Sequence, residues 1–279
     1  MENKSSRIGI AFSGGGAKGI AHIGVLKALL ENGIVPDVVS GTSAGSIMGA
    51  MYAAGRTTDE METFIKDTSI VKIFRLVGMP GAGLVRLAYL KERLAEFLHE
   101  DSFEALKLPL FVCATNLNLG KAVFFSSGPL YDIVIASCSV PWLFKPVEIG
   151  GSLYADGGIV CNLPATPIRP LCDMLIGSNV KPKVRIEENK ELQTFVGISQ
   201  RVADLGLWTN SKPNIKLCDV YIASEKVNEF SFFNLRKTKE LVDIGYEAAM
   251  EQMPKLLKLL KQHNGKELLG ADVHSNGLG

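Results

Sequence analysis

The chain has 279 residues, of which 47% are hydrophobic, and its formal net charge is +1. This length is enough for one large α/β domain, or for one domain with a small subdomain. Acidic and basic residues are interleaved without a basic stripe, which argues against a nucleic-acid partner.

The first residues and the cysteines bear on where the protein works. Residues 1–7 are polar and lead straight into an apolar run, so we expect no signal peptide. No stretch approaches the roughly 20 apolar residues that a membrane span needs. The five cysteines include no C-x-x-C pair, and we expect reduced, buried thiols instead of disulfides or a zinc site. The sequence thus predicts a soluble cytoplasmic protein, with transient membrane-surface contact left open.

Predicted strands and helices alternate along the chain. Apolar runs bounded by turn residues predict strands, and apolar residues at helical spacing predict helices. This order is typical of an α/β fold with a mainly parallel central sheet flanked by helices in three layers. We expect strands at about 7–12, 38–40, 109–115, 122–125, 153–155, 174–178 and 220–223. We expect helices at about 20–31, 44–54, 58–67, 89–99, 129–138, 192–208 and 236–262, the last interrupted at Pro254.

Two segments each allow two interpretations. Residues 69–86 combine glycines with apolar side chains, which fits either a mobile cover over a lipid site or a loop packed on the core. Residues 255–261 carry lysines and leucines at helical spacing. Such a helix either packs its leucines on the core, which we favour, or lies on an anionic membrane surface.

A glycine-rich loop, residues 13–19, separates the first strand from the first helix. It does not fit a phosphate loop, because Lys18 is followed by glycine and not by Ser or Thr. Its spacing fits the dinucleotide fingerprint, with Asp37 near the expected ribose-binding acid, although Asp37 precedes the second strand. A third interpretation is an oxyanion hole, because consecutive glycines leave backbone N–H groups uncovered. A flexible turn is the simplest alternative.

The stretch Gly41-Thr42-Ser43-Ala44-Gly45 follows an apolar run and precedes a helical stretch of small residues. This Gly-x-Ser-x-Gly pattern predicts a nucleophile elbow, a sharp strand-to-helix turn with Ser43 at its apex. Side chains at Gly41 and Gly45 would collide across such a turn. The helix N-terminus would favour a developing anion beside Ser43. The alternative is a small-residue connection without chemistry.

A serine nucleophile needs a base, and the four histidines are poorly placed for that role. His22 lies within the first predicted helix, where packing on the sheet is the simpler interpretation. The other three lie in polar or charged stretches, at His99, His263 and His274. Asp156 instead follows a strand and precedes Gly157 and Gly158, at a strand end where open α/β sheets carry their chemistry. A carboxylate, with its usual pKa of about 4, becomes a stronger base when removed from water. A common Asp-Gly turn is the alternative.

These pieces together resemble the patatin-like phospholipase family over about residues 8–167. The glycine loop resembles the family's oxyanion motif and residues 41–45 its nucleophile elbow. Asp156-Gly157-Gly158 resembles its D-G-[GA] motif, and residues 21–26, 36–39 and 141–146 extend the likeness. The resemblance implies a catalytic domain at 8–167, with 168–279 completing the same α/β unit.

The resemblance also implies a function, a serine acyl hydrolase that cleaves carboxylic esters of lipids or phospholipids through an acyl-enzyme. Ser43 would be the nucleophile and Asp156 the base of a Ser–Asp dyad, while His22 would be structural. The oxyanion hole would consist of the backbone N–H groups of Gly14, Gly15 and Gly16. The residues expected to support the motifs are Lys18, Gly19, Gly41, Gly45, Gly157 and Gly158. No metal or organic cofactor would be needed.

Two other functions remain as alternatives. The first is a patatin-like binding or adaptor protein with little turnover. The second is a dinucleotide-binding protein of the Rossmann type, which depends on the glycine spacing of residues 14–19.

Overall fold

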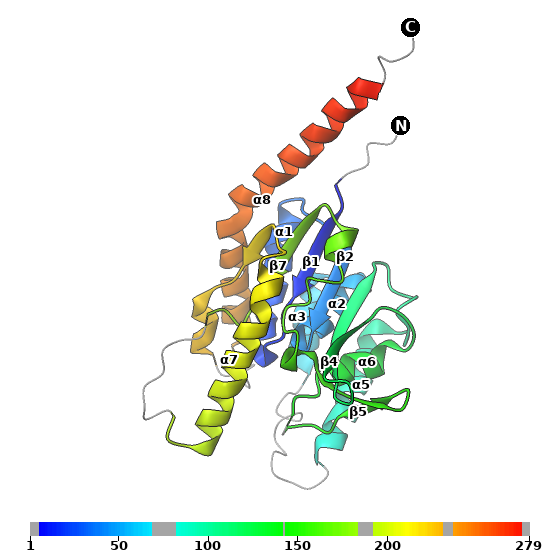
Figure 1. Ribbon diagram of the computed structural model, residues 1–279, viewed down its shortest axis with the longest axis vertical. Coiled ribbons are helices and arrows are strands. Elements are labelled where there is room, and N and C mark those ends of the chain that lie inside the picture. The colour runs from blue at the N-terminus through cyan, green and yellow to red at the C-terminus, as the bar shows by residue number, and fades with distance from the viewer. Residues whose placement is uncertain (1–5, 69–81, 142, 184–191, 231–236, 275–279) are drawn as a thin grey trace.

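The computed structural model describes residues 6–68, 82–141, 143–183, 192–230 and 237–274. Within these ranges eight strands form one sheet along the hydrogen-bonded path β5-β6-β3-β2-β1-β7-β8, and β4 pairs with β3 outside that path (Figure 1). The strands are β1 (Ile8–Phe12), β2 (Val38–Thr42), β3 (Leu110–Asn116), β4 (Lys121–Phe125), β5 (Val147–Ile149), β6 (Ser152–Asp156), β7 (Met174–Ser178) and β8 (Val220–Ile222).

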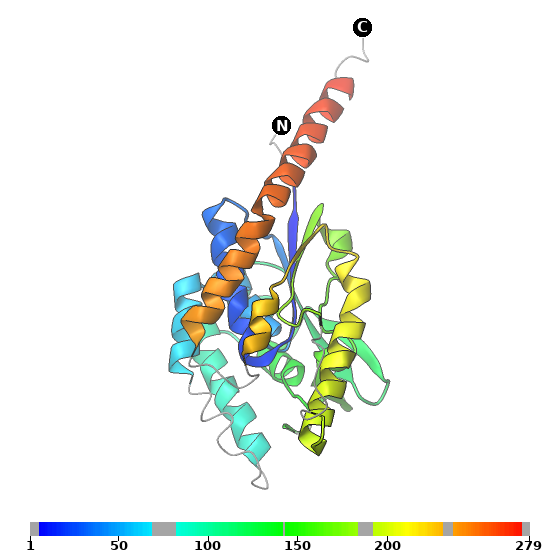
Figure 2. The ribbon, with the colours of Figure 1, turned by 90° about the vertical axis from the view of Figure 1, so that its left-hand side faces the viewer.

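Helices cover both faces of this sheet, which confirms the predicted three-layer α/β class. Helices α1 and α8 lie on one face and α7 on the other (Figure 2). The α-helices are α1 (Ala21–Glu31), α2 (Ala44–Ala53), α3 (Thr58–Asp67), α5 (Ala82–Leu98), α6 (Leu130–Ser137), α7 (Phe195–Ile215) and α8 (Thr238–His274). The short 3-10 helices are η1 (Gly16–Ile20), η2 (Gly157–Ile159), η3 (Arg169–Leu171) and η4 (Glu225–Glu229).

Strand β1 shows how the sheet buries both faces. Its alternate residues Ile8, Ile10 and Phe12 belong to the large core shared with the helices. Ala11 points the other way, into a smaller core that contains Leu163. Parallel pairing joins β1 to β2 and β7, β2 to β3, and β7 to β8. The central strands are therefore parallel and covered on both faces, as their continuous apolar sequences predict.

Three elements differ from the expectations. Most of the segment 69–86, for which a mobile cover and a packed loop were both open, lies outside the described residues, and its last part is helical, because α5 already begins at Ala82. Strand β5 was not expected; it pairs with β6 across a two-residue turn in which Gly150 and Gly151 both have positive φ. Helix α8 continues through Pro254, since Met253 and Leu256 are buried on either side and hold it against the body.

The basic, leucine-rich segment near the C-terminus forms part of α8. Leu256 is fully buried, Leu259 and Leu260 pack partly on the core, and Lys258 faces solvent. Leu257 is exposed, but the other three leucines of 255–261 contact the core, as the core-packing interpretation expects. In the described part of the chain, the helices lack the combination of length and apolar character that crossing a bilayer requires.

The strand that organises the candidate site is β3. Strand β4 pairs antiparallel with residues 112–116 of β3, β2 pairs parallel with 110–113, and β6 pairs antiparallel with 114–116. A strand residue has one partner on each edge, and β4 overlaps both other partners in register. Strands β2 and β6 therefore lie end to end along the same edge of β3, opposite β4.

The two strands on this edge run toward each other. The last residue of β2, Thr42, lies opposite Cys113, and the last residue of β6, Asp156, lies opposite Ala114. Their carboxyl ends therefore meet at neighbouring positions of β3. The register alone brings Ser43, which follows Thr42, beside Asp156.

Candidate active site

Ser43 occupies a strained turn between β2 and α2. Its φ of 52° and ψ of −125° are rare for a non-glycine residue and cost about 1–3 kcal/mol. A Cβ on Gly41 would lie 2.3 Å from the Gly45 carbonyl oxygen, and one on Gly45 would lie 2.4 Å from that of Phe12. The tight strand–turn–helix geometry predicted from the Gly-x-Ser-x-Gly sequence is thus present.

The backbone around Ser43 is fixed by two other serines. The Ser43 amide donates to Ser137 Oγ at 2.8 Å, and the Ser137 hydroxyl donates to the Cys113 carbonyl at 2.6 Å. The Ser46 hydroxyl donates to the Ser43 carbonyl at 2.6 Å. These bonds tie the strained turn to α6 and β3 at once. Ser137 carries no recognisable signal in the sequence, because its role depends on how α6 packs.

Asp156 is held as tightly as Ser43. Its amide donates to the Ser139 carbonyl at 2.9 Å, and its Oδ1 accepts from the Gly158 amide at 2.7 Å. A Cβ on Gly157 would lie 2.3 Å from the Cys113 carbonyl oxygen, so the turn after Asp156 needs glycine to pack on β3. The carboxylate therefore has a fixed direction.

The side chains of Ser43 and Asp156 meet. Both residues are only 6% exposed, and the Ser43 hydroxyl lies close enough to the Asp156 carboxylate to favour its charged form. Burial raises the pKa of Asp156 to about 6, although the neighbouring Ser43 hydroxyl and a hydrogen bond from the Gly158 amide favour the charged form. The site thus contains a buried hydroxyl beside a carboxylate that is more basic than usual.

The glycine loop lies against this pair. A Cβ on Gly14 would lie 3.1 Å from Ser43 Cβ, so the loop backbone packs directly on the serine. The Gly14 amide donates to the Asn162 carbonyl at 3.1 Å and is not available to a ligand in this geometry. In the described part of the chain, the Gly15 and Gly16 amides donate no hydrogen bond to the protein. Of the three backbone amides predicted for an oxyanion hole, only those of Gly15 and Gly16 are thus available to a ligand.

The His22 ring hydrogen-bonds to Ser13, at the start of the glycine loop. Its Nε2 lies 2.9 Å from the Ser13 carbonyl oxygen and its Nδ1 lies 2.8 Å from Ser178 Oγ. Burial lowers the pKa of His22 to about 4, so the ring is neutral. A carbonyl only accepts, so the proton is on Nε2 and Nδ1 accepts from the Ser178 hydroxyl. The ring faces Ser13 and Ser178 with both nitrogens occupied, as expected of a structural residue.

The remaining motif residues lie around the loop. Lys18 is buried, and its Nζ lies 3.4 Å from Asn228 Oδ1 of η4. A Cβ on Gly19 would lie 2.5 Å from the Cβ of Ala44, the first residue of α2. Gly19 therefore lets η1 approach the helix that begins at the elbow.

Helix α7 hydrogen-bonds to the segment after Asp156, and the sequence motifs do not predict this contact. Asn210 donates to the Gly158 carbonyl at 2.7 Å and accepts from the Asn162 amide at 3.0 Å. One turn later, Asn214 accepts from the Thr166 amide at 3.0 Å. The only sequence signal is a pair of asparagines four residues apart on a helix, which many surface helices share.

The structure argues against the dinucleotide interpretation. The Asp37 carboxylate accepts from the Ile8 amide at 2.8 Å, which places it at the start of β1. The glycine loop follows Phe12 at the other end of that strand. At about 3.3 Å per residue, the strand keeps Asp37 away from any ligand on the loop. In the ranges described above, no group of three His, Cys, Asp or Glu side chains could hold a metal ion.

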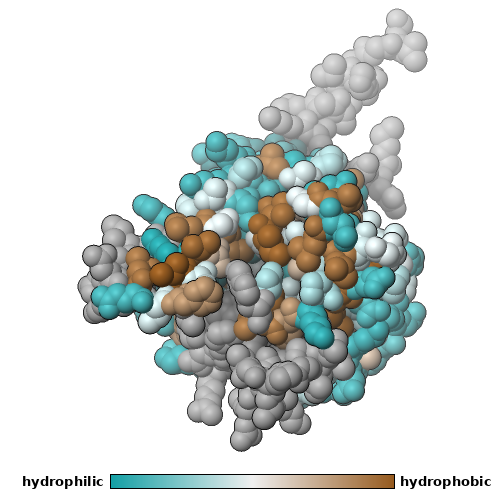
Figure 3. Space-filling view, turned by 60° about the horizontal axis from the view of Figure 1, so that its bottom comes forward, coloured by the Kyte–Doolittle hydropathy of each residue, from teal (hydrophilic) through white to brown (hydrophobic). Residues whose placement is uncertain are grey.

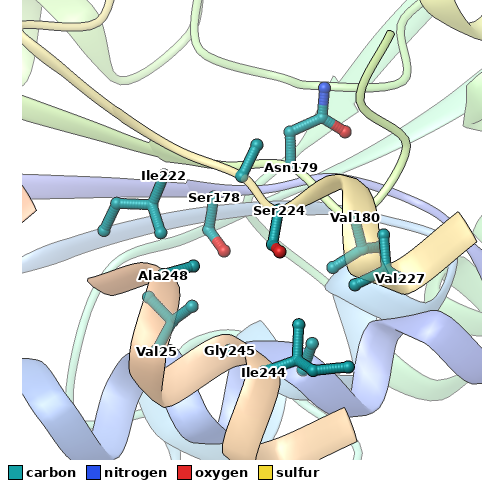
Figure 4. A pocket seen from close by; sticks show the side chains of 12 residues that line it. Val25, Ser178, Asn179, Val180, Ile222, Ser224, Val227, Ile244, Gly245 and Ala248 are labelled. Atoms are coloured by element: carbon teal, nitrogen blue, oxygen red, sulfur yellow. The ribbon is translucent and has the colours of Figure 1, made fainter. Parts of the chain in front are cut away.

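A small cavity lies between the sheet and the helices α1 and α8, separate from Ser43 and Asp156. Its volume is about 10 Å³, enough for about one water molecule. The hydroxyls of Ser178 and Ser224 point toward it, and Val25, Val227 and Ile244 close it (Figure 4). The cavity is too small for an acyl chain and is not a substrate site.

The chain is similar to a known protein family and to several known proteins. The family model described as patatin-like phospholipase matches residues 10–168. An uncharacterized NTE family protein of Mycobacterium tuberculosis is 37% identical over 168 residues, which cover 60% of this chain and 46% of that protein. The lysophospholipase NTE1 of Cryptococcus neoformans is 32% identical over 170 residues, covering 58% of this chain and 10% of that protein. The chain thus spans less than half the length of these curated relatives.

Among solved structures, VipD from Legionella pneumophila has a similar fold. The TM-score is 0.52 at 18% identity, and the match covers 86% of this chain and 67% of that chain. This match extends beyond residue 168, so strands and helices of the C-terminal part also belong to the shared architecture.

Proposed function

This chain belongs to the patatin-like phospholipase family, and we propose that it hydrolyses carboxylic esters of lipids with Ser43 as nucleophile and Asp156 as base. The observation that carries the proposal is that the register of β2 and β6 on β3 brings these two buried side chains together. The lysophospholipase named among the relatives supports a lipid ester as substrate.

The first step is a proton transfer between the two neighbouring side chains. Asp156 accepts the hydroxyl proton while Ser43 Oγ attacks the ester carbonyl carbon. A carboxylate whose pKa is raised to about 6 by burial accepts this proton more readily than an exposed one. The strained elbow holds the hydroxyl in place, so little reorganisation precedes the attack.

The negative charge that develops on the carbonyl oxygen needs donors. The amides of Gly15 and Gly16 are the candidates, because they follow Gly14, which packs on Ser43, and make no hydrogen bond within the described residues. The N-terminus of α2 adds a favourable dipole at the same place. The bond between the Gly14 amide and the Asn162 carbonyl, together with His22, fixes the loop before substrate arrives.

Collapse of the tetrahedral intermediate breaks the ester bond. The alcohol product leaves with the proton that Asp156 received, and the acyl group remains on Ser43 Oγ. Asp156 then accepts a proton from a water molecule, whose oxygen attacks the acyl carbon. Release of the carboxylic acid returns the proton to Ser43, so the two residues complete the cycle.

The test is covalent labelling combined with turnover. A fluorophosphonate probe should label Ser43, as located by mass spectrometry, and wild type should hydrolyse a long-chain acyl ester. Ser43→Ala should lose both signals, whereas Ser102→Ala, at a surface turn, should keep them. Label at another serine, or full hydrolysis by Ser43→Ala, contradicts the dyad. Labelling without turnover on any lipid ester would instead favour a binding or adaptor role.

A further inference from the structure

Helix α7 carries a line of large apolar side chains that face solvent. The line consists of Phe195, Ile198, Val202 and Leu205, which are 84%, 49%, 62% and 44% exposed. Spacings of three, four and three residues place them on one face of the helix. Single exposed apolar residues are ordinary, but four in register along one helix mark a surface that contacts something apolar. We refer to these four residues as the apolar line.

The same face becomes basic toward the C-terminal end of α7. Continuing the spacing from Leu205 through Thr209 leads to Lys212 and Lys216, and all three residues are exposed. A helix whose solvent face combines large apolar side chains with lysines has the composition of helices that lie in the surface of a membrane. Anionic lipid headgroups would pair with the lysines, while the apolar line would enter the acyl boundary.

The opposite face of α7 is fixed to the candidate active site. Asp204 forms an ion pair with Lys181, which follows β7. Leu207 lies close enough to Gly158 that a Cβ there would be 2.8 Å from its Cδ2. Asn210 holds the Gly158 carbonyl. The apolar line therefore has a fixed position relative to Asp156.

The apolar line also lies at the correct end of the molecule. The N-terminal half of α7 extends past the sheet on the side where β1 and β2 end and Ser43 is located (Figures 1 and 2). Apolar side chains are visible across this face in Figure 3. Ile159 and Val160, immediately after the Asp156 turn, are 45% and 37% exposed and add to them. A membrane touching the apolar line would lie next to the site that cleaves the ester.

We propose that the apolar line of α7 docks this protein on the surface of an anionic phospholipid bilayer and so presents the Ser43–Asp156 site to lipid substrates. The inference rests on the proposed ester hydrolysis, because the identity of the occupant follows from the lipid substrate. It goes further by naming the surface that recruits the enzyme.

The test measures vesicle binding and two activities of the full chain. Flotation uses vesicles of phosphatidylcholine with phosphatidylserine, and activity is measured on phospholipid in these vesicles and on a dissolved short-chain ester. The variant is Phe195→Ser with Val202→Ser. The matched control is Val35→Ser, which removes a valine that is 54% exposed at the opposite end of the sheet.

The double variant should bind vesicles at least about tenfold more weakly, because two apolar anchors are lost. Its hydrolysis of vesicle lipid should fall in parallel, while its rate on the dissolved ester stays unchanged. Val35→Ser should match wild type in all three measurements. Vesicle binding by the double variant equal to wild type overturns the inference.

Two further results separate the competing explanations. A wild-type dimer that the double variant dissolves, with vesicle binding unchanged, would assign the apolar line to a second copy and overturn the inference. Vesicle binding that depends on the apolar line, without hydrolysis of any ester, would support docking and contradict only the proposed function.

Discussion

Asn210 donates a 2.7 Å hydrogen bond to the carbonyl of Gly158, the residue whose own amide binds the Asp156 carboxylate. A side chain on α7 thus holds the turn that directs the Asp156 carboxylate. Replacing Asn210 by alanine leaves the Gly158 carbonyl and the Asn162 amide without partners. Each of these groups that is kept from water lowers the stability of the fold by about 1–3 kcal/mol.

We therefore predict that Asn210→Ala lowers kcat on a dissolved ester by about tenfold and leaves KM nearly unchanged. The pKa on the acid side of the pH–rate profile should also shift, because the environment of Asp156 changes. Steady-state kinetics over a pH series measures both. Thr209→Ala, on the exposed face one residue away, is the control and should behave as wild type. An unchanged pH profile with only a lower Tm would reduce Asn210 to a structural residue.

The second prediction concerns the pH dependence of catalysis. The proposed base, Asp156, must be unprotonated to accept the serine proton, and burial raises its pKa to about 6. We expect kcat/KM to be low in acid, to rise through about pH 6 and to level off above it. His22, whose pKa is lowered to about 4, should not contribute in this range. A profile that is already flat at pH 5 would exclude Asp156 as the titrating group.

The third prediction concerns stability at the same residue. A carboxyl whose pKa rises from 3.8 to about 6 on folding favours the folded state in acid, and this contribution is lost as the pH passes 6. The charged form then costs about 3 kcal/mol, at 1.36 kcal/mol per pKa unit. Asp156→Asn should be inactive yet more stable than wild type at pH 8. The difference should vanish below pH 4, as measured by urea unfolding at each pH. Equal stability at pH 8 would contradict the burial cost.

The fourth prediction uses the elbow glycines. Gly45→Ala places a Cβ 2.4 Å from the Phe12 carbonyl oxygen, so β1 and α2 must separate. We expect loss of ester hydrolysis and a drop of several degrees in Tm. Gly206→Ala on α7 is the matched control, because no heavy atom lies within 4 Å of its added Cβ. That variant should gain up to about 1 kcal/mol from helix propensity and remain active.

Sequence patterns were sufficient for the parts of the site that depend on local geometry. The elbow at Ser43 and the glycine turn after Asp156 require small residues at fixed positions. Such a requirement can be recognised from one amino-acid sequence. The alternation of apolar runs likewise predicted the three-layer class. The family match over 10–168 confirms the resemblance drawn from these motifs.

Other features depend on contacts between distant segments. Ser137 and Asn210 act through hydrogen bonds that exist only after α6 and α7 pack, and Asn162 through one to the distant glycine loop. Helix α8 passes Pro254 because tertiary packing outweighs a penalty of about 3 kcal/mol, which local propensity alone would not predict. Strand β5 did have a signal, since Gly150-Gly151 suits a two-residue hairpin turn.

The common edge of β3 has a mechanical consequence. The carboxyl ends of β2 and β6, next to Ser43 and at Asp156, pair with adjacent residues of β3. Strand β3 therefore fixes the separation of the two side chains. Bending of the outer strands therefore moves the Ser43 hydroxyl and the Asp156 carboxylate together. The protein can thus deform at its periphery while the separation of the Ser43 and Asp156 side chains stays constant.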